Sequence, residues 1–212
     1  MSSRPHLTFL LLAIAGATPV AQAAPSHRSV ANLVSGDECR GVAGYAAFSA
    51  ELRKAAVTQD VAALQRLFHP RGSMRVHGVY LSAAAADADR ARFAPVWAEI
   101  SDILNRGCAR NGKRLILPAI ASLAEQNVAT ETLIAIRPTW LHRQRSNHAR
   151  SVRIETGEML TEIVHGDIWT RVQLGTLEGK VRTADVRSPY DSRIELEWSD
   201  GRWTIIGFGS GV

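Results

Sequence analysis

Residues 133–186 read LIAIRPTWLHRQRSNHARSVRIETGEMLTEIVHGDIWTRVQLGTLEGKVRTADV. This stretch contains five short segments that favour β structure, at residues 133–138, 151–154, 159–164, 168–174 and 179–182. Three of the joints carry a glycine, at Gly157, Gly166 and Gly175. In the fourth segment apolar and polar residues alternate with the period of two that is typical of a half-buried strand. Short strands with turns between them predict a small closed β-barrel, because closure removes unpaired strand edges.

Three short motifs in this stretch resemble the bacterial SH3-like family of exported proteins. They read GEMLTEI (157–163), WTRV (169–172) and GKVR (179–182). The family has a Gly-Asp/Glu turn before a strand, a Trp-x-x-Val strand and a Gly-Trp-Val strand. The resemblance covers about a quarter of the 212 residues. It implies an SH3-like β-barrel over residues 129–188, in a binding or targeting module of the kind often directed at the cell wall. Lys180 stands where the family usually has an exposed Trp, which weakens the family's usual ligand groove.

The same stretch carries the local positive charge of the chain. Residues 137–153 hold five basic residues and no acidic one. Guanidinium groups bind carboxylates and phosphates through paired hydrogen bonds, and indole rings offer stacking surfaces. The candidate ligand-binding residues are therefore Arg137, Trp140, Arg143, Arg145, Arg150 and Trp169. Two alternatives stay open: the arginines belong to a solvated loop, and Trp169 belongs to the core of an alternating strand.

The first 23 residues read as a cleavable signal peptide. Arg4 and His6 precede a short apolar run from Leu7 to Ala15, and Ala21-Gln22-Ala23 supplies a small-x-small cleavage site. The run is too short to span a bilayer, which takes about 20 residues. We expect cleavage after Ala23, a periplasmic or secreted protein, and no membrane span once the signal is removed.

Charge outside the basic loop is nearly balanced. Of the 25 basic residues, Arg4 lies in the signal and five lie in residues 137–153, which leaves 19 against 20 acidic residues. A nucleic-acid-binding domain is more often basic across a whole face. Nucleic acid is therefore not an expected partner.

Cys39 and Cys108 are the two cysteines of the chain. Export places both in an oxidising compartment, where a single disulfide between them is the economical interpretation. Two buried thiols are the alternative. A nucleophilic cysteine is not expected, because it would need an unpaired thiol beside a base.

Residues 24–39 are expected to form a flexible lead, and residues 40–128 a mainly α-helical domain. Apolar residues recur there at steps of three and four, as in Tyr45, Phe48 and Leu52, and again from Phe93 to Leu104. The expected fold class is α+β, with this helical part, the SH3-like barrel and a C-terminal hairpin.

The hairpin is predicted within residues 189–212. Ser199-Asp200-Gly201 joins two alternating segments, and Asp-Gly is a strong hairpin signal. An isolated hairpin is marginal in stability, so it is expected to pack on the helical part. The pattern also resembles the last two strands of cone-shaped nuclear-transport-factor-like folds, and the barrel would then be inserted into that domain. The barrel either follows the helical part or interrupts it.

Two functions from different classes remain. The first is a non-catalytic binding or targeting module for an anionic envelope ligand, such as peptidoglycan, whose stem peptides carry carboxylates, or for an envelope protein. The second is an enzyme or small-ligand-binding protein with a pocket lined by Phe93, Trp97 and Trp203. The histidines show no metal-ligand spacing, and neither a phosphate loop nor a nucleophile elbow is present. We therefore expect neither metal nor cofactor, and favour the binding module.

Overall fold

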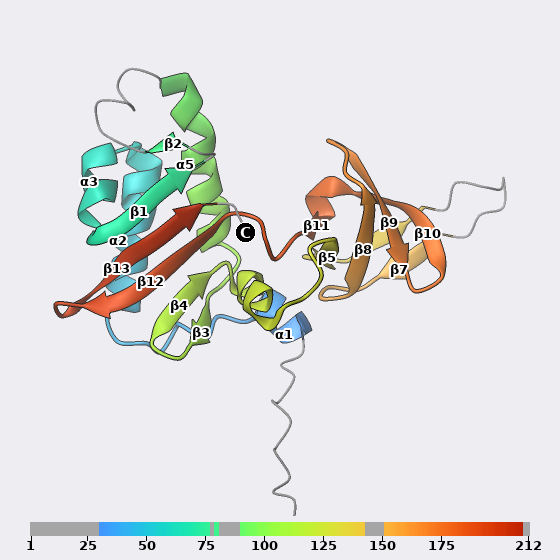
Figure 1. The fold of residues 1–212 in the computed structure, drawn as a ribbon, viewed down its shortest axis with the longest axis horizontal. Coiled ribbons are helices and arrows are strands. Elements are labelled where there is room, and N and C mark those ends of the chain that lie inside the picture. Colours follow the sequence, from blue (N-terminus) through green and yellow to red (C-terminus); the bar gives the residue numbers. More distant parts are fainter. Residues whose placement is uncertain (1–29, 77–78, 81–89, 143–150, 210–212) are drawn as a thin grey trace, which may run out of the picture.

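The structure is a computed structural model that describes residues 30–76, 79–80, 90–142 and 151–209. These residues form two lobes (Figure 1). The described residues within 37–117 and 193–209 build the first, called here the sheet–helix lobe, and those within 132–187 build the second, the inserted lobe. Among the described helices, none is long and apolar enough to cross a membrane.

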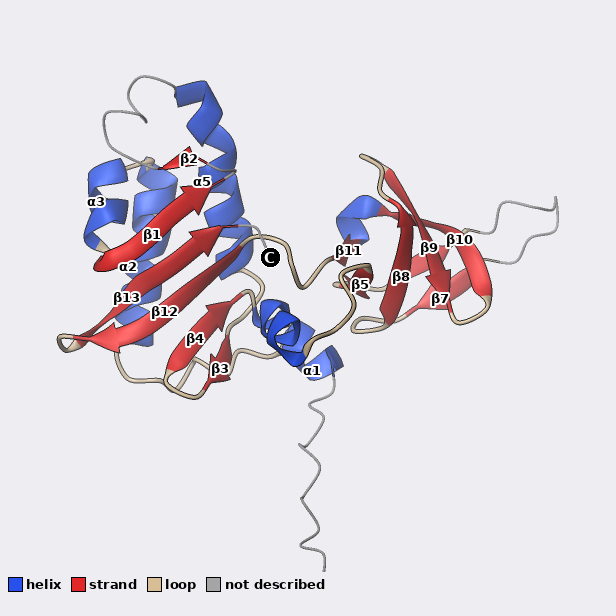
Figure 2. Cartoon of the chain, in the orientation of Figure 1, coloured by secondary structure: helices blue, strands red, loops and turns tan. Residues whose placement is uncertain are grey.

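A six-stranded sheet is the framework of the sheet–helix lobe. Its strand order is β2-β1-β13-β12-β4-β3, and only the β1–β13 pair is parallel. The strands are β1 (Phe68–Val76), β2 (Val79–Tyr80), β3 (Ala109–Asn111), β4 (Arg114–Leu117), β12 (Arg193–Ser199) and β13 (Arg202–Gly209). One face of the sheet is covered by the helices α2 (Tyr45–Thr58), α3 (Val61–Arg66) and α5 (Arg90–Leu104), as Figure 2 shows.

The core of this lobe lies between the helices and the sheet. Leu52 on α2 and Ile100 and Ile103 on α5 are fully buried there, together with Leu196 and Ile205 of the hairpin. The 3.6-residue spacing of these apolar positions places them on one face of each helix. The α3 helix is capped by Asp60, whose carboxylate accepts a hydrogen bond from the Ala63 N–H at 2.8 Å.

A disulfide joins Cys39 to Cys108, which confirms the predicted pair. Both residues are fully buried, and their Cα atoms are 5.6 Å apart. The bond ties the segment before α2 to the segment after α5. Asp37 lies close to the two sulfur atoms. Sulfur atoms that are bonded to each other do not supply the thiolates that a metal ion would need.

The inserted lobe contains an open five-stranded sheet with the order β10-β9-β8-β5-β11. The strands are β5 (Thr132–Ala135), β8 (Met159–Val164), β9 (Trp169–Leu174), β10 (Leu177–Arg182) and β11 (Val186–Arg187), with a short 3₁₀ helix η2 (Thr183–Asp185) before β11. A separate pair, β6 (Thr139–Leu141) and β7 (Val152–Ile154), lies beside it. Leu133, Leu141, Ile154, Val172 and Val181 form the buried core.

The lobes meet at α1 (Val30–Ser35) and the 3₁₀ helix η1 (Ala119–Gln126), which lie between them in Figure 1. A third buried cluster forms there from Leu33, Ile120, Leu123 and Ile134. Gly157, at a φ of +88°, lets the turn before β8 approach α1, since a Cβ at this position would lie 2.5 Å from the backbone of Ala31. The expected flexible lead, residues 24–39, therefore includes a helix that packs against both lobes.

The predicted fold class is wrong in two respects. Residues 40–128 supply four strands as well as helices, and residues 132–187 form an open sheet with a separate strand pair, not a closed barrel. The strands β3 and β4 are three and four residues long, too short to show a clear period, and Pro70 and Gly72 interrupt the pattern of β1.

The C-terminal hairpin turns at Asp200 and Gly201, as predicted, but it does not merely pack on helices. Its two strands lie in the middle of the six-stranded sheet, between β1 and β4. The inserted lobe interrupts this sheet in sequence, because β4 precedes it, β12 follows it, and the two strands are hydrogen-bonded neighbours.

Candidate functional site

The outward side of four strands in the inserted lobe carries the candidate site. Along β9, Trp169, Arg171 and Gln173 are exposed, whereas Thr170 and Val172 are fully buried. The same alternation leaves Trp140 exposed between the buried Thr139 and Leu141 of β6. Successive side chains of a strand point to opposite faces, so one side of these strands forms the core and the other faces solvent.

The register brings the outward residues together. Trp140 lies opposite Arg153, Lys180 opposite Arg171, and Arg182 opposite Trp169. Directly opposed residues of antiparallel strands project to the same face. The backbones of His142 and Lys180 exchange two hydrogen bonds of 2.9 Å, which connects β6 to β10. One continuous surface results, called here the cationic–aromatic face, which consists of Trp140, His142, Arg153, Trp169, Arg171, Lys180 and Arg182.

Gly179 allows this connection between β6 and β10. A Cβ at Gly179 would lie 2.7 Å from Cγ of Leu141 and 2.9 Å from the carbonyl oxygen of His142. A glycine inside a strand often marks such a close backbone approach. The Gly-Lys-Val motif therefore has a structural role, because it lets β6 lie against β10.

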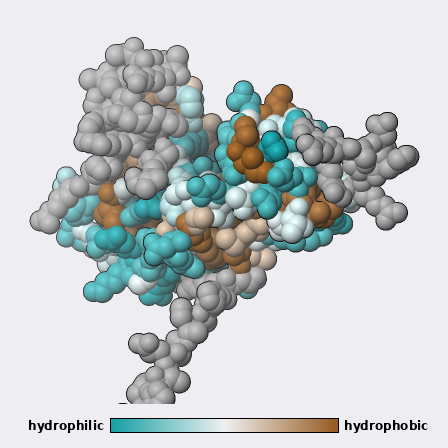
Figure 3. Space-filling view, turned by 45° about the vertical axis from the view of Figure 1, so that its right-hand side comes forward, coloured by the Kyte–Doolittle hydropathy of each residue, from teal (hydrophilic) through white to brown (hydrophobic). Residues whose placement is uncertain are grey.

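The two indole rings of the face are open to solvent. Trp140 is 49% exposed and Trp169 is 38% exposed. The guanidinium of Arg182 lies 5.3 Å from the centroid of the Trp169 ring, and the imidazole of His142 meets that ring edge-on at 5.2 Å. Trp169 is thus on the solvent side of its strand and not in the core, a choice that alternation alone leaves open. Figure 3 shows apolar and hydrophilic side chains next to each other on this lobe.

Cations outnumber carboxylates on the face. Arg171 is paired with Glu178 at 2.8 Å, and Arg153 with Glu155 at 2.9 Å. Within the described part of the chain, Lys180 and Arg182 have no carboxylate at ion-pair distance. Both cations are on β10, the strand between those that carry Trp140 and Trp169, and an anionic group bound there would meet two cations that no acid among the described residues neutralises.

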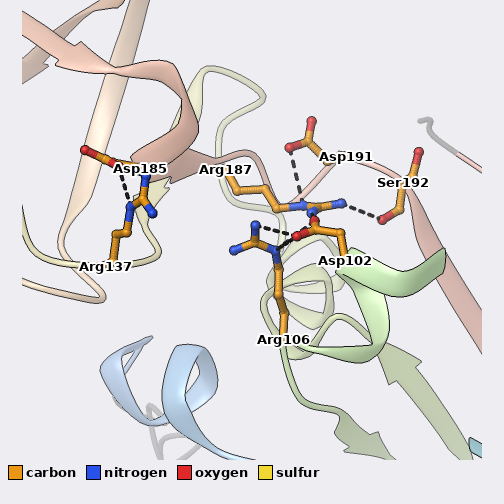
Figure 4. A network of polar contacts seen from close by, with 7 residues as sticks. All are labelled: Asp102, Arg106, Arg137, Asp185, Arg187, Asp191 and Ser192. Carbon is orange, nitrogen blue, oxygen red and sulfur yellow. Dashed lines mark hydrogen bonds and ion pairs between the residues drawn. The ribbon is translucent and has the colours of Figure 1, made fainter. Parts of the chain in front are cut away.

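Arg137 has a structural partner away from the face. Its guanidinium is paired with the carboxylate of Asp185 on η2, and the hydroxyl of Thr139 donates to the same carboxylate at 2.6 Å. Asp185 is only 6% exposed. This arginine compensates a buried charge and connects the start of β6 to η2 (Figure 4).

The remaining predicted residues divide into two groups. Arg143, Arg145 and Arg150 lie outside the described residues. Trp140 and Trp169 lie on the cationic–aromatic face. Sequence analysis did not identify Arg171, Lys180 and Arg182 as site residues. The resemblance marks Lys180 only as a departure from the family's tryptophan. The signal that identifies all three is the hairpin that turns at Gly175, because its pairing places Arg182 opposite Trp169 and Lys180 opposite Arg171.

A second polar cluster lies at the junction of the lobes (Figure 4). Asp102 of α5 accepts hydrogen bonds from Arg106 Nε at 2.9 Å and 2.8 Å, and it is also paired with Arg187 of β11. Arg187 further lies 3.6 Å from Asp191 and donates to the carbonyl oxygen of Ser192 at 3.3 Å. Partial burial opposes ionisation of Asp102, but the hydrogen bonds and charges of Arg106 and Arg187 outweigh it and lower the pKa of this carboxyl. The cluster connects the lobes.

The aromatic residues expected to line a pocket in the other lobe are part of its core. Phe93, Trp97 and Trp203 are 5%, 6% and 8% exposed and belong to one packed cluster. The indole N–H of Trp203 donates to the carbonyl oxygen of Ala43 at 2.9 Å, so its polar group is satisfied inside the fold. These three side chains fill space between the helices and the sheet.

Comparisons with known proteins assign no family. No family model matches the chain, and no curated protein matches it. Among solved structures it is similar to AclR from Streptomyces galilaeus, a "putative hydroxylase", at 11% sequence identity. That match covers 78% of this chain and 86% of AclR with a TM-score of 0.26, which is too low to support an argument about fold or function.

Proposed function

We propose that the chain is an exported, non-catalytic binding protein that holds an anionic cell-envelope ligand, such as peptidoglycan, on the cationic–aromatic face. The observation that carries this proposal is the pair Lys180 and Arg182 on β10, two cations without an acid partner among the described residues, on the strand between the two that carry the exposed indoles. Charge-assisted hydrogen bonds to carboxylates are stronger than neutral ones, and exposed aromatic rings add contact area.

Two further observations support the proposal. The disulfide between Cys39 and Cys108 is compatible with an oxidising compartment, as the predicted signal peptide would require. The arginines at positions 143, 145 and 150 belong to the segment that connects β6 to β7, two strands of the face. We include these arginines in the proposed binding region on sequence grounds.

The test is co-sedimentation of residues 24–212 with purified peptidoglycan sacculi. The variant Lys180→Gln/Arg182→Gln should bind at least about tenfold more weakly, because each charge-assisted hydrogen bond contributes about 1.5–3 kcal/mol and 1.4 kcal/mol is tenfold. Binding of the parent should also weaken with salt, since exposed charges are screened over about 8 Å at physiological ionic strength.

The matched control is Lys113→Gln/Arg202→Gln, which removes the same two charge types from exposed positions of the sheet–helix lobe. It should sediment like the parent. Equal retention of both double variants, or no retention of the parent, would refute the proposed function.

A further inference from the structure

The arrangement of rings and charges on the cationic–aromatic face indicates what kind of anion it suits. Trp140 lies two residues before His142 on the outward side of β6, and His142 is bridged to Lys180 of β10. On β10, Arg182 lies opposite Trp169 of β9. Across β6, β10 and β9, the outward side therefore carries an indole, two cations and a second indole. Neighbouring strands are about 4.8 Å apart, so the backbones of β6 and β9 are roughly 10 Å apart where the bridge joins β6 to β10.

One line of side chains runs across the three strands. His142 lies opposite Lys180, and Lys180 lies opposite Arg171. Lys180 and Arg182 thus place two cations on β10, the strand between the two that carry the indoles, and the Arg182 guanidinium lies 5.3 Å from the centre of the Trp169 ring. Arg171 is occupied by Glu178. The unneutralised charge of the described face is therefore concentrated at one place, with an aromatic surface on either side.

From this pattern we infer that the ligand is an acidic glycan, an inference that rests on the proposed function. Two pyranose rings would place their C–H faces on Trp140 and Trp169, and a carboxylate of the same chain would lie between them against Lys180 and Arg182. A glycan with one carboxylate for every two sugars matches the order of ring, charge and ring. The separation of the two strands that carry the indoles, two strand spacings, is comparable to the length of a disaccharide.

An acidic peptide fits this surface less well. Extended peptides commonly bind at the edge of a sheet, where unpaired backbone groups offer hydrogen bonds. Here the rings lie on a face, above strands whose backbones are bonded within the lobe. A peptide backbone laid over the face would lose water without gaining such partners, which is costly. Sugar hydroxyls that point away from the rings keep their contact with water.

Single-stranded nucleic acid is the other polymer that combines stacking rings with negative charge. Its charges repeat at every nucleotide and favour a groove that is basic along its length. The described face instead concentrates its unneutralised charge at Lys180 and Arg182, and two of its other cations already have acid partners. Oligo(dT) is therefore a test of the inference.

The experiment is calorimetric titration of residues 24–212 with four probes at one ionic strength. Hyaluronan oligosaccharides carry one carboxylate per disaccharide, chitooligosaccharides are neutral, poly-L-glutamate carries carboxylates without sugars, and oligo(dT) carries phosphates and bases. We expect hyaluronan to bind at least tenfold more tightly than each of the other three. Trp140→Ala and Trp169→Ala should each weaken hyaluronan binding about tenfold and leave poly-L-glutamate binding unchanged, whereas Lys180→Gln should weaken both.

Controls separate a lost ring from a damaged lobe. Trp169→Phe, which keeps an aromatic surface, should retain most of the affinity that Trp169→Ala loses. Trp198→Ala removes a 46%-exposed tryptophan from the other lobe and should leave binding unchanged. Binding of poly-L-glutamate or oligo(dT) as tight as that of hyaluronan would overturn the glycan assignment. So would Trp140 and Trp169 variants that bind hyaluronan like the parent. Anion binding would stand in both cases. If none of the anionic probes and no sacculi bind, both proposals fall.

Discussion

The two lobes differ in how far most of their tryptophans are buried, although Trp198 of the sheet–helix lobe is also 46% exposed. In the sheet–helix lobe, Trp97 and Trp203 are 6% and 8% exposed, and the disulfide lies beside them in the same core. In the inserted lobe, Trp140 and Trp169 are 49% and 38% exposed, next to lysine and arginine. Burial of a large ring stabilises a fold, whereas exposure of one leaves it available to a ligand. Under the proposed function, the first lobe is the scaffold and the second carries the binding surface.

The largest expected effect on stability concerns the scaffold. Cys39→Ala/Cys108→Ala should lower the free energy of unfolding by about 2–5 kcal/mol, because the bond closes a loop across a sequence separation of 69 residues. Urea denaturation measures this change. Neither cysteine lies in the inserted lobe, so binding to sacculi should persist under conditions in which the variant is folded. A variant with parental stability, or one that is folded but does not bind, would break the division between scaffold and binding lobe.

A smaller effect is expected where the lobes meet. Asp102→Asn should lower the free energy of unfolding by about 1–2 kcal/mol. The reason is that the side chain of Arg187, which is 11% exposed, loses a charged partner. Glu178→Gln, which removes an exposed partner of Arg171, is the control and should change stability by less than about 0.5 kcal/mol. Equal losses of stability in the two variants would show that the Asp102–Arg187 pair is no better protected from water than the exposed Glu178–Arg171 pair.

The contribution of the Asp102 carboxyl to stability depends on pH. Its folded-state pKa lies below its ordinary value, so its contribution to stability is fully present above about pH 3.9, the usual value for aspartate, and is lost as the pH falls through the folded-state pKa. Unfolding midpoints of the parent and of Asp102→Asn should therefore differ at neutral pH and converge in strong acid.

The smallest expected effect concerns Tyr45 and tests how well the sheet–helix lobe excludes water from this ring. Burial, with a contribution from the charge of Asp37, raises the pKa of Tyr45 to about 12. Above pH 10 the unfolded chain loses the Tyr45 proton, whereas the folded protein keeps it up to about pH 12. The contribution of Tyr45 to the free energy of unfolding is therefore fully present below pH 10 and declines between pH 10 and 12. The decline is at most about 1.4 kcal/mol per pH unit.

Urea unfolding at pH 9 and pH 11 measures this decline, and Tyr45→Phe should show a smaller loss than the parent over the interval. The same slope in both proteins would mean that water reaches this ring as freely as it reaches the exposed indoles of the inserted lobe.

Local chemistry made several features predictable. Asp200 and Gly201 both adopt a positive φ, which explains why this dipeptide is a reliable turn signal. The two cysteines had one possible partner each within the chain. The apolar spacing in α2 and α5 is strong enough to identify both helices. Arg137 shows the limit of such reasoning, because its partner Asp185 is 48 residues away and no spacing rule connects them.

By itself, the sequence determined the hairpin, the cysteine pair, the two main helices, and the concentration of five basic residues, with no acidic one, in residues 137–153. Only the tertiary structure decided that the hairpin lies at the centre of a six-stranded sheet, that the inserted strands leave an open sheet, and that Trp169 faces solvent. The physical reason is that a period of two defines two faces of a strand but does not say which one is buried. That choice depends on the neighbouring strands, and here Gly179 and the register of β6 against β10 place Trp140, Lys180, Arg182 and Trp169 on the same outward side.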